Sequence, residues 1–225
     1  MELSEAGKKE AKSAGKILKE QGYDFDICYT SYLKRAIQTL EIALDTMDRN
    51  WLPVIKSWKL NERHYGALQG LNKSDTAKKY GEEKVKIWRR SFDVAPPFLD
   101  EWDERNPKKD VMYRQEEKEF LPLGESLKDT IDRVIPYFEE AIRHSIQENQ
   151  RGLLVAHGNS LRALMKYLEG YTPEEILRVN IPTGIPLVYE LDESGRVLSK
   201  EYLGDQDTIN AKIQAVVQQG TANRE

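Results

Sequence analysis

The feature that most limits how this chain can fold is the alternation of short apolar runs with segments of helical periodicity. The runs at 27–29, 53–56 and 153–156 predict strands, because each is short, apolar and bounded by polar residues. The segments between and around them repeat apolar residues every three or four positions and predict amphipathic helices. This order indicates an α/β fold with a mostly parallel sheet flanked by helices.

Polar residues that can accept a bond from a free backbone N–H mark the expected helix starts. Ser31 is expected to cap the helix after the first strand, and Asn159 with Ser160 the helix after the strand at 153–156. Ser126 and Asp129 have the spacing of a capping box at the head of a helix expected to run to about residue 148.

The length of 225 residues suits a single domain spanning 1–225. The stretch at about 57–125 is rich in Trp, Arg, Lys and Pro, and we interpret it as a lid insertion with short helices. The segments 186–191 and 197–203 predict a hairpin, and the polar tail at about 206–225 is expected to be mobile.

Composition excludes several classes of protein. With 34 basic and 38 acidic residues the net charge is −4, which argues against a nucleic-acid or membrane-surface protein. No apolar run approaches the roughly 18 residues of a membrane span, and the opening is polar, so we expect a cytoplasmic protein. The single cysteine, Cys28, lies inside an apolar run and is expected to be buried.

Three candidate site residues follow predicted strands, at the sheet edge where such folds bind ligands. His157 ends the run at 153–156, and Gly158 then permits a tight turn into a helix whose first amides suit an anion. Glu62 lies in LNERHYGALQG and could act as a general acid or base. Arg35, early in a helix, could contact a phosphate.

Each of these residues also has a structural reading. His157 could be an ordinary hydrogen-bonded histidine, and Glu62 could form a surface ion pair with Arg63. Arg35 could be a helix-surface cation. However, Arg89, Arg90 and Lys73 add positive charge to the lid of an acidic protein, which favours an anionic substrate. The sequence has no metal-binding motif and no glycine-rich nucleotide loop, so it predicts an enzyme or binder of a small phosphorylated anion.

Longer strings in the chain resemble one family. CYTSYLKRAIQT, LNERHYGALQGLNKSDTAKKYGEEKVKIWRRSFDVAPP, LPLGESLKDTIDRVIPYFEE and LLVAHGNSLRAL are similar to segments of the cofactor-dependent phosphoglycerate mutases of the histidine phosphatase superfamily. The resemblance runs from residue 3 to beyond residue 200. It implies interconversion of 3-phosphoglycerate and 2-phosphoglycerate through a phosphohistidine, primed by 2,3-bisphosphoglycerate without a metal.

The resemblance also implies roles for individual residues. Glu62 would exchange protons with the substrate hydroxyls, and His157 would stabilise charge on the transferring phosphoryl group. The residues implied to bind substrate, a small phosphorylated carboxylate, are Arg35, Arg63, His64, Tyr65, Lys73, Arg89, Arg90, Gly158 and Asn159. A homo-oligomer is left open.

The chain departs from the family at one motif. Family members carry the phosphoryl group on the histidine of an Arg-His-Gly string after their first strand, and this sequence has no such string. Its histidines are His64, His144 and His157. Truncation and a misplaced start are both open. We therefore expect the first, central strand to be missing, unpaired strand edges to be exposed, and the chain by itself to be inactive.

Two other functions stay open at this point. One is a non-catalytic phosphoglycerate-binding or interaction protein, which the absence of the nucleophile supports. The other is a broader histidine phosphatase, which the complete mutase-like lid disfavours.

Overall fold

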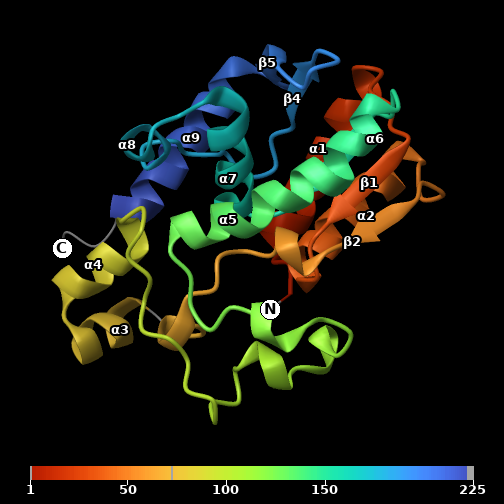
Figure 1. Cartoon of the computed structure of the whole chain (residues 1–225). Coiled ribbons are helices and arrows are strands. Elements are labelled where there is room, and N and C mark those ends of the chain that lie inside the picture. The colour runs from red at the N-terminus through yellow and green to blue at the C-terminus, as the bar shows by residue number, and fades with distance from the viewer. Residues whose placement is uncertain (1, 72, 222–225) are drawn as a thin grey trace.

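A parallel sheet forms the centre of the fold. The computed structural model describes residues 2–71 and 73–221. Strands β1 (Ile27–Thr30), β2 (Val54–Lys56) and β3 (Gly152–Val155) lie in the order β2-β1-β3, and both pairings are parallel. Figure 1 shows this sheet between helices on its two faces, as the alternation of strands and helices predicted.

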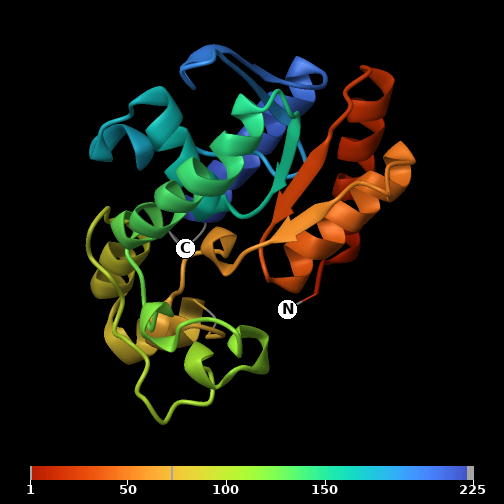
Figure 2. The same ribbon diagram turned by 45° about the vertical axis from the view of Figure 1, so that its right-hand side comes forward.

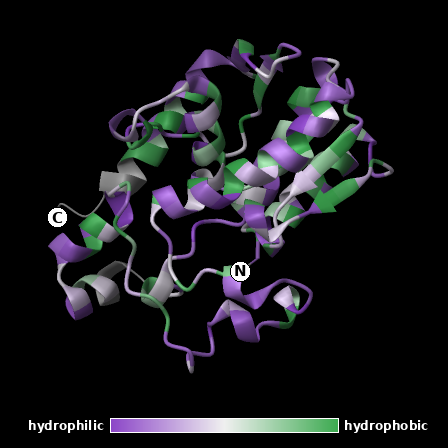
Figure 3. Cartoon of the chain, viewed as in Figure 1, coloured by the Kyte–Doolittle hydropathy of each residue, from purple (hydrophilic) through white to green (hydrophobic). Residues whose placement is uncertain are grey.

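The side chains of β1 alternate between two apolar layers, as the pleat of a strand requires. Ile27 and Tyr29 pack with Phe138 and Ile142 on one face of the sheet. Cys28 is fully buried on the other face, against Leu40 of helix α2 (Lys34–Met47), and burial raises the pKa of its thiol to about 11. The cysteine is therefore a core residue, as expected. In Figure 3 the strands β1 and β2 stand out as hydrophobic.

Helix α1 (Glu5–Glu20) packs against α2, which covers one face of the sheet. Ser31 does not cap α2 as expected. The N-cap is Leu33, without a side-chain bond, and Ser31 Oγ instead accepts a bond from the Leu33 amide at 3.1 Å and contacts His157. The Ser31 hydroxyl is therefore a hydrogen-bond partner of His157.

The opposite face is covered by α5 (Leu127–Tyr137), α6 (Arg143–Gln147) and α7 (Gly158–Glu169). Ser126 and Asp129 form the predicted capping box. The helix does not run regularly to residue 148, because Phe138–Ile142 forms a π-helical turn just after Pro136. Proline lacks the N–H that would bond to the preceding turn, and a single π-turn also interrupts the regular α-helical bonding pattern.

Helix α7 begins differently from the sequence expectation. Its N-cap is His157 rather than Asn159 or Ser160. Ser160, three residues into the helix, bonds back to the cap residue: its Oγ accepts a hydrogen bond from the His157 amide at 3.1 Å. This bond fixes the backbone of His157 where the strand turns into the helix.

The segment expected to be a lid, residues 57–125, lies at one end of the sheet. Its described residues form short helices, namely α3 (Lys73–Tyr80), α4 (Glu82–Arg90) and 3-10 turns at Trp58–Leu60, Gly66–Leu68, Pro107–Lys109, Val111–Tyr113 and Lys118–Phe120. Figure 2 shows it as the yellow and green region beside the ends of the strands. Glycine is required at position 66, where the backbone of the segment passes close to that of Pro97. Its φ is +54°, and a Cβ there would lie 2.2 Å from the carbonyl oxygen of Pro97.

The last part of the chain is a hairpin followed by a helix. Strands β4 (Leu187–Leu191) and β5 (Val197–Tyr202) pair antiparallel as predicted, but as a sheet of their own. Of the tail expected to be mobile, residues 206–221 form helix α9 (Gln206–Thr221), and residues 222–225 lie outside the described part of the chain. A short helix, α8 (Pro173–Ile176), precedes the hairpin. Apolar and polar contacts both hold α9, since Ile209 is 3% exposed and Lys212 Nζ donates to Glu10 at 2.6 Å.

Among the described residues, β2, β3, β4 and β5 each have one edge without a strand partner. Strand β3 pairs only with β1, and β4 pairs only with β5. Leu153 of β3 and Val188 of β4 nevertheless pack against the same cluster of Leu18, Met47 and Leu203. The two sheets therefore share one apolar cluster without pairing with each other. Within residues 2–71 and 73–221, no helix is long and apolar enough to cross a membrane.

Candidate functional site

His157 lies at the carboxyl end of β3 and is 5% exposed. Its Nδ1 accepts a hydrogen bond from Arg35 Nε at 3.2 Å, and its Nε2 lies 2.7 Å from Ser31 Oγ. Because Nδ1 accepts, the ring proton is on Nε2 and is donated to the serine hydroxyl. Burial, followed by the charges of Arg35 and Arg133, lowers the pKa of His157 to about 3. The imidazole is therefore neutral at physiological pH in this arrangement.

Glu62 contacts the first turn of α7, the helix that follows this histidine. Its Oε1 accepts the amide N–H of Arg63 at 2.8 Å and that of Asn159 at 3.2 Å. A carboxylate at this position is favoured by the free amides and the positive dipole end of the helix. The amide of Asn159 thus holds the carboxylate at the carboxyl edge of the sheet, where the sequence predicted that Glu62 and His157 would meet.

A buried ion pair supports the loop that carries Glu62. Arg133 of α5 contacts both carboxylate oxygens of Glu125, at 2.6 and 3.0 Å, and the two side chains are 9% and 3% exposed. Arg133 also donates to the carbonyls of Lys59 at 2.6 Å and Asn61 at 3.0 Å. Glu125 accepts the His64 amide at 2.7 Å. The backbone on both sides of Glu62 is therefore fixed by one pair of side chains.

The ring of Tyr65 organises two lid arginines. The guanidinium carbon of Arg63 lies 4.6 Å from the ring centroid and that of Arg89 lies 5.4 Å from it. Such contacts stabilise cations that are held close to one another. Tyr65 Oη accepts a bond from Asn159 Nδ2 at 3.2 Å, which connects the lid to the start of α7.

Comparison with known proteins assigns the family. The family model described as the histidine phosphatase superfamily (branch 1) matches residues 1–104 and 97–202. A 2,3-bisphosphoglycerate-dependent phosphoglycerate mutase of Lachnoclostridium phytofermentans is 69% identical over 98% of this chain and 88% of the relative. The enzyme of the same name from Treponema denticola is 64% identical over 98% of this chain and 89% of the relative. The chain belongs to the phosphoglycerate mutase family.

Solved structures agree with the fold of this mutase-family chain. The alpha-ribazole phosphatase of Shigella flexneri superimposes with a TM-score of 0.65 at 20% identity, covering 90% of this chain and 84% of that one. A mycobacterial glucosyl-3-phosphoglycerate phosphatase gives a TM-score of 0.63 at 22% identity, covering 89% and 84%. At this identity the likeness concerns the α/β architecture alone.

In this mutase-family chain most of the predicted site residues line one pocket between the sheet edge and the lid. Those of the sequence prediction that line it are Arg35, Glu62, Arg63, His64, Tyr65 and Arg89. The Asn159 amide donates to Glu62, a Cβ at Gly158 would lie 3.9 Å from Glu62 Oε2, and His157 contacts Arg35. Arg90 is exposed and is not among the lining residues. The side chain of Lys73 lies outside the part of the chain that the structure describes.

His64 has a local structural role within the pocket wall. Its Nδ1 accepts the Gly66 amide at 3.1 Å, and burial lowers the pKa of its imidazole. It is therefore neutral and helps to hold the turn at Gly66.

Sequence reasoning missed three arginines of this region. Arg105 lines the pocket and donates to the carbonyl of Gln69 at 2.6 Å, while Arg133 and Arg162 lie behind the pocket wall. None of them directly follows a strand, and Arg162 lies three residues, about one helical turn, after Asn159 in LLVAHGNSLRAL. That helical spacing was the only signal for Arg162.

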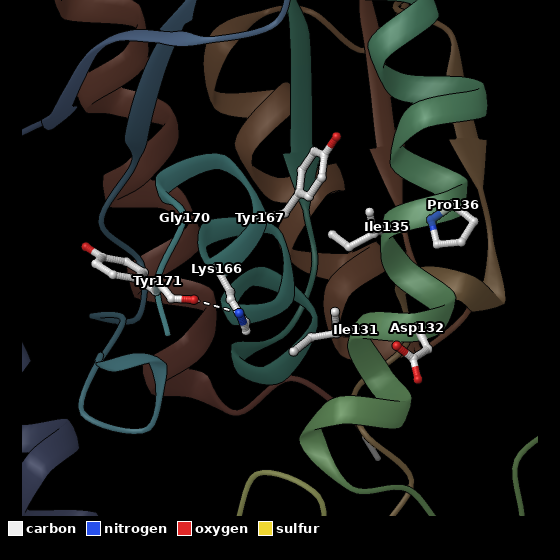
Figure 4. Close-up of a pocket in the computed structure, with 8 residues that line it drawn as sticks. All are labelled: Ile131, Asp132, Ile135, Pro136, Lys166, Tyr167, Gly170 and Tyr171. Atoms are coloured by element: carbon white, nitrogen blue, oxygen red, sulfur yellow. Dashed lines mark hydrogen bonds between the residues drawn. The ribbon is translucent and has the colours of Figure 1, made fainter. Parts of the chain in front are cut away.

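A second hollow lies between α5 and α7 (Figure 4), lined by Ile131, Asp132, Ile135, Pro136, Lys166, Tyr167, Gly170 and Tyr171. It contains none of the predicted site residues. Across the described residues, no group of His, Cys, Asp and Glu is arranged to hold a metal ion.

Proposed function

We propose that this chain supplies the substrate site for the interconversion of 3-phosphoglycerate and 2-phosphoglycerate by phosphoryl transfer. The observation that carries the proposal is the placement of one carboxylate, Glu62, beside the arginines Arg35, Arg63 and Arg89 in a single pocket. Arginines bind phosphate and carboxylate groups, and a carboxylate can exchange protons with a hydroxyl. The names of the two close relatives agree with this chemistry.

Glu62 is the proposed proton donor and acceptor for the substrate hydroxyls. Among the described residues, both backbone donors to its carboxylate contact Oε1, which leaves Oε2 for the substrate. Arg35, Gly158 and Asn159 are proposed to hold the phosphoryl group, with His157 stabilising its charge. Arg63, His64, Tyr65, Arg89 and Lys73 are proposed to bind the remaining part of the substrate.

The pocket fits the primer 2,3-bisphosphoglycerate as well. Arg63 and Arg89 each have a buried Nε without a hydrogen-bond partner, and Arg35 lines the same pocket. Unpaired buried guanidinium groups are costly, so a ligand with several negative charges complements them. When bound, this primer supplies the phosphoryl group that charges the enzyme.

In the proposed reaction a histidine carries the phosphoryl group, and none of the three histidines of this sequence is placed to do so. His157 is bonded through both ring nitrogens, and His144 is exposed on α6 beside Glu148. His64 uses its Nδ1 to hold the turn at Gly66. Turnover is therefore proposed to require an Arg-His-Gly segment in addition to residues 1–225.

The proposal includes a cytoplasmic location and self-association. Support for a homo-oligomer comes from the free edge of β2, where Val54 and Ile55 are 39% and 42% exposed and Trp51 is 72% exposed. Apolar edge strands tend to pair with another chain. Sedimentation velocity of the wild type and of Ile55→Lys tests this part, and a monomeric wild type would contradict it.

Calorimetric titration with 3-phosphoglycerate tests the binding site directly. We expect Arg89→Met to weaken binding at least tenfold, because a charge-assisted contact to the anion is lost. Arg196→Met is the matched control, since Arg196 is exposed in the hairpin turn. Equal affinity of the two variants, or no binding by the wild type, would contradict the proposal.

A further inference from the structure

Arg162 of α7 is a half-buried arginine outside the pocket lining. Its Nη2 donates to the carbonyl of Ile176 in α8 at 2.6 Å, and its Nη1 contacts Asn159 Oδ1 at 3.5 Å. Its Nε is buried without a partner. Burial and the nearby charge of Arg63 lower the pKa of its guanidinium. A half-buried arginine with a buried, unpartnered Nε and a second arginine in its electrostatic surroundings needs an explanation beyond helix packing.

The contact with Asn159 determines which way that side-chain amide faces. An asparagine amide has one accepting oxygen and one donating nitrogen, and the two ends are similar in shape. Arg162 can only donate, so it selects the orientation in which Oδ1 faces the guanidinium. Nδ2 then faces Tyr65 Oη, to which it donates at 3.2 Å.

The bond between Asn159 and Tyr65 connects the orientation of the Asn159 amide to two arginines of the lid. The ring of Tyr65 is flanked by the guanidinium groups of Arg63 and Arg89, at 4.6 and 5.4 Å from the centroid. Arg63 also donates to the carbonyl of Arg89 at 3.1 Å. A fixed Tyr65 hydroxyl therefore fixes the ring against which both arginines rest.

We propose that Arg162 is a positioning residue of the substrate site, acting through Asn159 and Tyr65 on the arginines Arg63 and Arg89. Arg162 does not touch the substrate. It makes the arrangement of the lid arginines depend on the α7–α8 segment, because the same guanidinium is anchored on the Ile176 carbonyl. The inference rests on the proposed site for a phosphorylated carboxylate, and the test below separates the two.

Lys166 provides a matched control on the same helix. Its Nζ donates to the carbonyl of Tyr171 at 2.6 Å, so it too connects α7 to the segment that leads into α8 (Figure 4). It has no contact with Asn159 or Tyr65 among its described hydrogen bonds. Arg162→Met and Lys166→Met therefore remove similar structural ties, but only the first removes the contact to Asn159.

The first measurement uses binding of 3-phosphoglycerate by calorimetry. We expect Arg162→Met to weaken binding about tenfold and Lys166→Met to change it less than twofold. In a Tyr65→Phe background, which removes the hydroxyl, Arg162→Met should weaken binding less than threefold further, because contacts in one network are not additive. An undiminished effect in that background, or equal effects of the two single variants, would overturn the inference.

The second measurement needs no ligand. The side-chain amide of Asn159 is followed in ¹H–¹⁵N spectra of the wild type and each variant. We expect its signals to shift in Arg162→Met and in Tyr65→Phe and to stay in place in Lys166→Met. If Arg162→Met does not fold, Arg162→Lys serves instead, since a single ammonium cannot reach both Ile176 and Asn159 with the fork of a guanidinium.

The two measurements distinguish the possible failures. A wild type that does not bind 3-phosphoglycerate, with the expected amide shifts, counts against the proposed function and leaves the positioning role of Arg162 intact. Unmoved amide signals in Arg162→Met or its lysine substitute would overturn the positioning role whatever the binding result.

Discussion

Arg133 and Glu125 form a buried two-point ion pair directly behind the loop that carries Glu62, with N–O distances of 2.6 and 3.0 Å. The pair comes from α5 and from the residue just before its N-cap. Because Arg133 also binds the carbonyls of Lys59 and Asn61, the loop that carries the candidate acid–base residue is held by a helix that covers one face of the sheet.

Removing the cation of this pair should destabilise the fold. Arg133→Met leaves Glu125 charged and buried without its partner, which typically costs about 3 to 5 kcal/mol. Lys128→Met is the control, because Lys128 pairs with Asp132 at the exposed surface of the same helix. Urea denaturation followed by tryptophan fluorescence measures both, and similar midpoints for the two variants would contradict the role of the pair.

The polypeptide of residues 1–225 should have no measurable mutase activity, even with 2,3-bisphosphoglycerate supplied. A phosphoenzyme cannot form without a histidine free to act as the nucleophile. A coupled assay for 2-phosphoglycerate formation tests this, together with mass spectrometry for phosphohistidine. A stable phosphohistidine at His157 would show that the assignment of the carrier is wrong.

Extending the chain with an N-terminal strand and loop containing Arg-His-Gly should give an active enzyme. In that background we expect Glu62→Gln to lower kcat about 10² to 10⁴-fold while KM changes much less, because proton transfer is needed only as the barrier is crossed. Glu119→Gln, an exposed carboxylate of the lid, is the control. If Glu62→Gln keeps the wild-type kcat, Glu62 is a structural residue.

Acidification should destabilise the protein through His157. The pKa of this histidine is lowered to about 3, so between roughly pH 6.5 and 3 the unfolded state binds a proton that the folded state does not. Stability therefore falls as the pH falls across this window, by at most about 1.4 kcal/mol per pH unit for one group. His157→Asn, which keeps a good N-cap residue, should flatten the profile of urea midpoints, whereas the exposed His144→Asn should not. Identical slopes for both would contradict the assignment.

The same extension with an N-terminal strand should raise stability and reduce aggregation. The free edges of β3 and β4 leave backbone groups without strand partners, and each buried unpaired group costs about 1 to 3 kcal/mol. Whole domains are stable by only roughly 5 to 15 kcal/mol, so a few such losses are large. Parallel denaturant melts with light scattering compare the two forms. An equal midpoint and equal solubility would show that no strand is needed between those edges.

The sequence by itself determined the elements that depend on local pattern. The strand of β1, the capping box at Ser126 and the hairpin of β4 and β5 lie where periodicity and turn residues predicted them. It also indicated that Arg35, Glu62 and His157 would meet, because the carboxyl ends of parallel strands share one edge of a sheet. These are consequences of spacing along the chain.

Only the tertiary structure decided which polar groups face one another. Ser31 contacts His157 rather than capping α2, and residues 206–221 form a helix because Ile209 finds an apolar site. Arg133 and Arg162 contact residues of the site from helices α5 and α7. The pattern of apolar and polar residues in these helices is that of an ordinary amphipathic helix and does not mark either arginine. Their partners lie far away along the chain or on another element, and a hydrogen bond depends on distance and direction in space, which no local pattern specifies.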